Sequence, residues 1–159
     1  MEGVVSGGLI LFYVLFLLPF LFYLRTLHRC QQIAKKRNRS LSKSLLLLNL
    51  IPLFNFFWAF FTVIQTSNTI TDEYDDLKIK KRTSGGRTVG ILYATLALMC
   101  CIPYVGIFAV LPCILFWILH WNEVSTCTRD IKRQKEKNKL EAFSSNHPGL
   151  KQIRRQLNQ

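Results

Sequence analysis

Three apolar runs without a single charged residue constrain this chain more than any other feature. They span residues 4–24, 45–65 and 88–121. A helix of about 20 apolar residues crosses a hydrocarbon core of about 30 Å, and such runs are typical of membrane proteins. Half of the 159 residues are hydrophobic. The sequence therefore predicts an all-α, polytopic membrane protein rather than a soluble domain.

The first run predicts an N-terminal transmembrane helix within residues 1–24. A signal peptide is the alternative, but it would carry basic residues before its apolar core and a small-residue cleavage site after it. Here Glu2 precedes the run, and Arg25 and Arg29 follow it. The positive-inside rule then places the N-terminus outside and residue 25 onward in the cytoplasm.

The second run, residues 45–65, is interrupted by Pro52. The segment before this proline is about two helical turns long, which is too short to cross a bilayer. Asn49 and Asn55 flank the proline. Their side-chain amides could form hydrogen bonds with backbone N–H and C=O groups that lose their helical partners at a turn. We expect a first membrane hairpin that turns at Pro52 and Asn55.

The third run, residues 88–121, is too long for one span and contains Pro103 and Gly106. We expect a second hairpin that turns at these two residues. A single kinked helix is the alternative, and it would leave residues 66–87 outside the cell. Small residues repeat at helical spacing and predict close helix packing, at Gly90, Ala94, Ala97, Cys101, Gly106, Ala109 and Cys113.

All 21 Lys and Arg lie between or after the apolar runs, and the net charge is +12. The domains follow from this pattern: a basic linker at 25–44, an amphipathic arm and linker at 66–87, and a basic tail at 122–159. Two inward-returning hairpins keep every basic segment, and the C-terminus, in the cytoplasm. The residues expected to contact the anionic inner leaflet or a partner are Lys35, Lys36, Arg37, Lys151, Arg154 and Arg155.

Acidic residues cluster at Asp72, Glu73, Asp75 and Asp76. They lack the spacing and glycine of a calcium loop. Solvated charges facing the basic run at 78–82 are the expected structure. His120 is interpreted as a residue of the membrane interface, and the five cysteines as free thiols.

The tail is expected to prolong the last membrane helix, with Lys137 and Glu141 spaced for an i, i+4 ion pair. A turn at 144–149 would end that helix. A short basic helix at 150–157 is expected to lie on anionic lipid or on a partner.

No residue set predicts catalysis, a cofactor or a metal site, since His28, His120 and His147 are far apart in sequence and lack motifs. The leading hypothesis is a non-enzymatic accessory or scaffolding subunit of a membrane complex, or a homo-oligomer, with the small-residue face of 90–113 as its interface. A membrane tether for nucleic acid is the weakest alternative. A stronger one is an oligomeric pore or membrane-disrupting effector, with a polar lining of Asn49, Asn55, Thr62, Gln65 and Thr95.

The blocks LLLLNLIPLFNFFWAFFTVIQTSNTI and GILYATLALMCCIPYVGIFAVLPCILFWILHWNEV resemble the membrane region of uncharacterised small bacterial multi-spanning membrane proteins, some with a GYF-like domain ahead of it. The similarity covers roughly 41–130. This chain departs from the pattern by having an apolar helix and a basic linker where that soluble domain would sit. The resemblance implies a bacterial inner-membrane setting and no activity. It depends on Ile51-Pro52, Asn55, Trp58, Ile102-Pro103, Gly106 and the segment 117–121.

Overall fold

The structure, a computed structural model, describes residues 2–80 and 84–146, and side chains are described from residue 17 onward, except at 52, 53 and 146. All regular elements within these ranges are helices, which confirms the predicted all-α class. In chain order they are α1 (Glu2–Ile33), the 3-10 turn η1 (Lys36–Asn38), α2 (Lys43–Leu47), the 3-10 turn η2 (Leu48–Leu50), α3 (Pro52–Asp76), α4 (Arg87–Met99) and α5 (Val105–Asn146).

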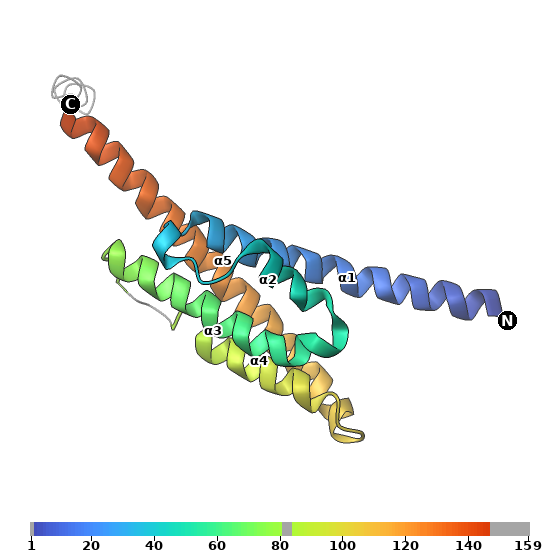
Figure 1. The fold of residues 1–159 in the computed structure, drawn as a ribbon. Coiled ribbons are helices and arrows are strands. Elements are labelled where there is room, and N and C mark those ends of the chain that lie inside the picture. The colour runs from blue at the N-terminus through green and yellow to red at the C-terminus, as the bar shows by residue number, and fades with distance from the viewer. Residues whose placement is uncertain (1, 81–83, 147–159) are drawn as a thin grey trace, which may run out of the picture.

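The long helices α1 and α5 run in the same direction, side by side (Figure 1). The Trp121 indole donates to the Thr26 hydroxyl at 2.9 Å, and Lys135 Nζ donates to the Ile33 carbonyl at 2.5 Å. Helix α3 also runs this way, whereas α4 runs back between α3 and α5. The chain is thus a bundle in which the C-terminal parts of three helices gather at one end.

The first Ile-Pro pair separates α2–η2 from α3. Ile51 is extended, with φ −83° and ψ 109°, as expected for a residue before proline. Pro52 occupies the first turn of α3, where its missing N–H has no partner to lose. The Trp58 indole then donates to the Leu45 carbonyl at 2.8 Å, which holds the short leg against α3. Asn55 lies inside the first turn of α3, beyond the break.

The second Ile-Pro pair lies in the connection between α4 and α5. Tyr104 has a φ of +65°, and α5 starts at the next residue. Gly106 approaches the Cys100 carbonyl so closely that a Cβ there would lie 2.5 Å from its oxygen. Residues 88–121 therefore form two helices, and the single kinked helix does not occur. Pro112 lies within α5 and does not end it.

The predicted small-residue face lies largely inside the bundle. Gly90 and Ala94 of α4 and Ala109 of α5 are buried, while Ala97 and Cys113 are half-buried. Gly106, the second residue of α5, is buried, and Cys101, in the connection before it, is exposed. A Cβ at position 90 would lie 2.5 Å from Val63 of α3, so glycine sets the spacing of these helices.

The basic linker predicted at 25–44 differs most from the structure. Helix α1 continues through Arg25 to Ile33, and η1 folds back onto the end of α3. The tail agrees with its prediction, since α5 runs on to Asn146 and Lys137 pairs with Glu141 at 3.9 Å. The basic helix predicted at 150–157 lies outside the described residues.

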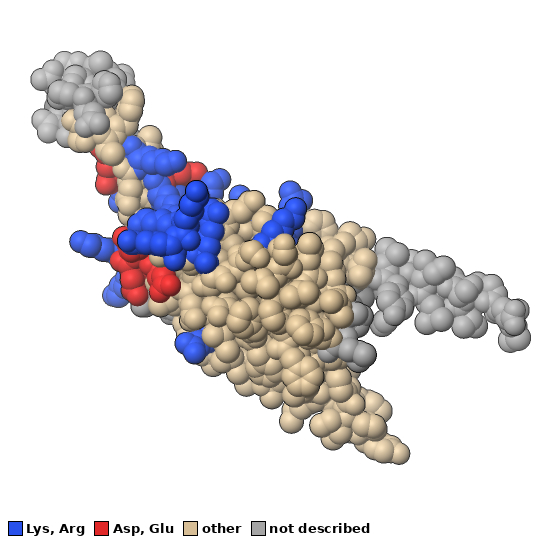
Figure 2. Space-filling view, in the orientation of Figure 1, with Lys and Arg blue, Asp and Glu red and all other residues tan. Residues whose placement is uncertain are grey.

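Charged side chains gather at the end where α1, α3 and α5 meet, and the end with the two helix breaks is almost free of them (Figure 2). Among the described residues, one helix is long and apolar enough to cross a membrane, namely α5 over Val105–Ser145. All five cysteines lie within the described residues, and none of them forms a disulfide.

Candidate functional site

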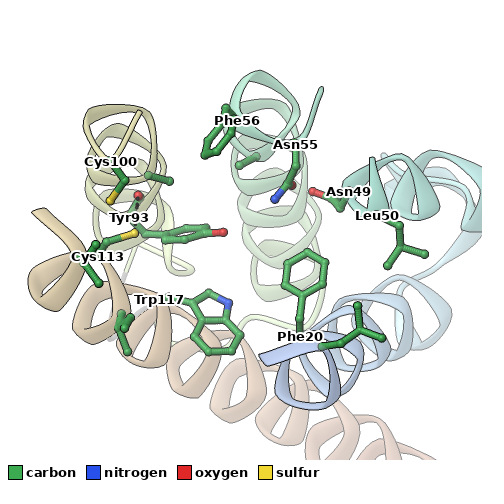
Figure 3. A pocket seen from close by; sticks show the side chains of 14 residues that line it. Phe20, Asn49, Leu50, Asn55, Phe56, Tyr93, Cys100, Cys113 and Trp117 are labelled. Carbon is green, nitrogen blue, oxygen red and sulfur yellow. Dashed lines mark hydrogen bonds between the residues drawn. The ribbon is translucent and has the colours of Figure 1, made fainter. Parts of the chain in front are cut away.

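An apolar cavity of about 480 Å³ lies between the helices in the half of the bundle that carries the breaks. Its walls include Phe20 of α1, Phe56 of α3, Tyr93 of α4 and Trp117 of α5, which face one another in Figure 3. All of its lining residues are uncharged. The size and the composition are those of a site for a largely apolar small molecule.

Several polar atoms face this space (Figure 3), among them the Tyr93 hydroxyl and the Asn55 amide, together with the Asn49 oxygen and the Trp117 indole nitrogen. Tyr93 is only 8% exposed, and no hydrogen bond to its hydroxyl is present among the described residues. The half-buried Asn55 amide also faces the cavity without a described partner. A buried tyrosine hydroxyl usually finds a hydrogen-bond partner. The cavity is therefore largely apolar, and the Tyr93 hydroxyl and the Asn55 amide at its wall have no described hydrogen-bond partner.

Most residues proposed for a pore lining are occupied inside the bundle. Asn49 donates to Thr62 Oγ1 at 3.1 Å and to the Leu46 carbonyl at 3.0 Å, and both Asn49 and Thr62 are buried. The Thr95 hydroxyl donates to the Ile91 carbonyl on the exposed face of α4. Gln65 is half-buried on α3. The structure brings Asn49, Asn55 and Thr62 together and leaves Thr95 apart.

His120, interpreted from the sequence as a residue of the membrane interface, is fully buried among the helices. Its Nδ1 lies 3.0 Å from the Gly86 carbonyl oxygen. A Cβ at Gly90 would lie 2.7 Å from the same nitrogen, so the ring occupies space left by two glycines. Tyr93 stacks on it with ring centroids 6.5 Å apart. The i, i+4 spacing of these glycines was the available sequence signal.

Glu73 is also fully buried, so the prediction of a solvated acidic cluster is wrong here. The Lys35 backbone N–H donates to its Oε1 at 2.6 Å, and the Asn38 amide donates to the same oxygen at 2.9 Å. Lys135 Nζ of α5 lies 2.7 Å from Oε2. This carboxylate joins α1–η1, α3 and α5.

Asp76, one turn further along α3, extends the same network. It accepts from Lys35 at 3.1 Å, from Asn38 at 2.8 Å and from Arg37. The Arg37 guanidinium, followed by the Asn38 amide and the Lys35 ammonium, holds the pKa of the Asp76 carboxyl well below its usual range. Asp72 remains exposed. No group of residues within the described ranges could hold a metal ion.

Of the six basic residues predicted to contact lipid or a partner, three lie within the described residues. Lys35 and Arg37 bind Asp76 through their charged groups, and Lys36 is exposed. Lys151, Arg154 and Arg155 lie outside the described residues. A basic surface nevertheless persists at this end, where α5 adds further lysines and arginines (Figure 2).

A comparison with protein families, curated proteins and solved structures found no match to this chain. The functional proposal therefore depends on the geometry above. The sequence did not single out Tyr93, and it placed Glu73 only in an acidic cluster that was expected to be solvated. Tyr93 falls between Gly90 and Ala97 on the predicted packing face, and Glu73 lies three residues after Ile70 on the buried face of α3, so helical spacing carried a weak signal for both.

Proposed function

We propose that this chain is a non-enzymatic, multi-pass membrane protein that acts by assembly, as an accessory or scaffolding subunit or as a homo-oligomer. The observation that carries the proposal is the outer face of α5, where Ile107, Phe108 and Leu111 are 76%, 83% and 77% exposed. A contiguous apolar surface of this kind marks a membrane or protein contact.

The proposed topology has the N-terminus outside, two hairpins that return inward and a cytoplasmic C-terminus. The separation of charges from helix breaks along the bundle supports it, because basic segments remain on the cytoplasmic side. The bacterial inner membrane is part of the proposal as the location that the resemblance stated for residues 41–130 implies.

Cysteine accessibility tests this topology. Ser84, which is exposed in the connection before α4, is changed to cysteine in a background whose native cysteines are alanine, and intact cells are treated with an impermeant maleimide. We expect Ser84→Cys and the tail control Asn138→Cys to react only after lysis, and Glu2→Cys to react at once. Labelling of position 84 on intact cells would contradict two inward-returning hairpins.

The interface of the assembly must differ from the one expected from the sequence. The small-residue face packs inside the bundle, since Gly90 and Ala94 are buried against neighbouring helices. The partner surface therefore moves to the exposed face of α5. The partner expected there is another membrane protein or a second copy.

A photoreactive amino acid at Leu111 tests the assembly. On irradiation in membranes we expect a protein adduct of defined mass, visible as a shifted band on a denaturing gel. The control position is Leu140, which is 70% exposed on the basic extension of α5. If Leu111 gives only lipid adducts, the assembly does not use this face and the proposal fails.

The pore alternative has weaker support, because Asn49 and Thr62 satisfy each other inside the bundle. No described feature favours a nucleic-acid tether over contact of the basic end with anionic lipid.

A further inference from the structure

The apolar cavity carries an inference that uses the membrane setting of the proposed function but not the assembly role. Its walls are mostly aliphatic and aromatic, with Asn49 and Asn55 among them, and five helical segments contribute to them. In a bilayer such a space adjoins hydrocarbon rather than water. An empty apolar cavity of about 480 Å³ would forfeit the van der Waals contacts of its whole lining.

The polar groups at the wall distinguish this space from a simple packing defect. The Tyr93 hydroxyl, on a side chain more than nine-tenths buried, points into the cavity with no described hydrogen-bond partner. The Asn55 amide faces the same space from α3. Leaving such groups unsatisfied in hydrocarbon is costly, and a bound molecule with matching polar atoms would remove that cost.

We propose that the cavity binds an uncharged, single-chain acyl ester of the membrane, of the monoacylglycerol class. The acyl chain fills the space between Phe20, Phe56 and Trp117. The ester and glycerol oxygens exchange hydrogen bonds with the Tyr93 hydroxyl and the Asn55 amide. The headgroup is uncharged because no lining residue carries a charge that could compensate one.

Photolabelling of the full-length protein in phosphatidylcholine vesicles tests the proposal. The probe is a monoacylglycerol with a diazirine in its chain, and labelled peptides are mapped by mass spectrometry. We expect saturable labelling of residues between 93 and 117, which excess unlabelled monoacylglycerol removes. Labelling that rises linearly with the probe, or that resists competition, is contact with bulk lipid and overturns the proposal.

Two variants with matched controls locate the site. Tyr93→Phe removes one oxygen and should weaken apparent binding about five-fold, the effect of one hydrogen bond. Tyr104→Phe removes the same oxygen from a side chain that is 85% exposed, and it should behave as wild type. Ala97→Phe fills the cavity and should abolish saturable labelling, whereas Ala142→Phe on the exposed tail should not.

Unchanged binding in Tyr93→Phe overturns the proposal even if Ala97→Phe fails to fold, because Tyr93→Phe leaves the cavity walls in place. Thermal unfolding of each variant identifies misfolded protein. The protein adduct at Leu111 is measured separately, so a failed cavity and a failed assembly are distinguishable.

Discussion

Removing the buried carboxylate of Glu73 should loosen the attachment of α1 and α5 to α3. The carboxylate is fully buried, accepts two hydrogen bonds from the α1–η1 segment and pairs with Lys135. Glu73→Ala leaves the Lys35 N–H without its acceptor and Lys135 without its anion. The Asn38 amide keeps its second acceptor, Asp76, at 2.8 Å.

The size of the effect follows from this geometry. Removing one partner of a buried ion pair costs about 3–5 kcal/mol. The Lys135 side chain is 24% exposed and can turn toward water, so we expect a loss near the lower limit, about 3 kcal/mol. For a chain of this length that loss lowers the melting temperature by roughly 6–12 °C. Glu73→Gln keeps an acceptor oxygen and loses only the ion pair, so its shift should be smaller.

Thermal unfolding in mild detergent, followed by tryptophan fluorescence, measures the shift. Limited trypsin digestion adds a local readout, since release of η1 exposes the bonds after Lys35, Lys36 and Arg37. The matched control is Asp72→Ala, one residue earlier and exposed, which should change stability by less than about 0.5 kcal/mol. Equal melting temperatures for Glu73→Ala and Asp72→Ala would refute the reasoning.

Two further expectations concern the same bundle. Gly90→Ala places a methyl group 2.5 Å from Val63 and 2.7 Å from His120. We expect it to lower stability by about 1–3 kcal/mol in the same unfolding assay, despite the better helix propensity of alanine. The exposed control Thr95→Ala should have little effect, and a stabilised Gly90→Ala would contradict the tight contact. Asp76 has a pKa lowered by Arg37, Asn38 and Lys35, so its contribution is present above its ordinary pKa of about 4 and is lost as the pH falls further. The melting-temperature difference between wild type and Asp76→Asn should therefore stay constant from about pH 7 to pH 5 and shrink below about pH 4. If the difference already disappears at pH 5, the folded state does not stabilise the Asp76 carboxylate as described.

The sequence predicted the helix breaks because they depend on local chemistry. Pro52 and Pro103 constrain their own backbones and those of Ile51 and Ile102, whatever surrounds them. The i, i+4 pair of Lys137 and Glu141 is local in the same sense. The end of α1 was harder to place, because residues 25–51 contain no proline or glycine, and the helix continues past Leu24 to Ile33.

The burial of Glu73 could not be predicted because its partners are distant in sequence. Lys35 and Asn38 precede it by 38 and 35 residues, and Lys135 follows from another helix. In the sequence, Glu73 lies among aspartates in a polar stretch, which is the pattern of a solvated carboxylate. Its burial becomes evident only when the positions of Lys35, Asn38 and Lys135 are known. The cavity could not be predicted either, since Tyr93 lies on α4 and Asn55 on α3, and only helix packing brings them to one space.

The polar network at Glu73 and Asp76 connects α1, α3 and α5 at the charged end of the bundle. Lys35, Asn38 and Lys135 tie α1 and α5 to α3 there, while the helix breaks at the other end join their neighbours in pairs. The three helices are therefore held together by buried polar contacts at the charged end, and we expect the opposite end of the bundle to move more easily. We expect the helices to separate transiently at the end that carries the helix breaks. Backbone amides near residue 105 should then exchange hydrogen faster than those near residue 70. Such separation would open the space beside Tyr93 without breaking an ion pair.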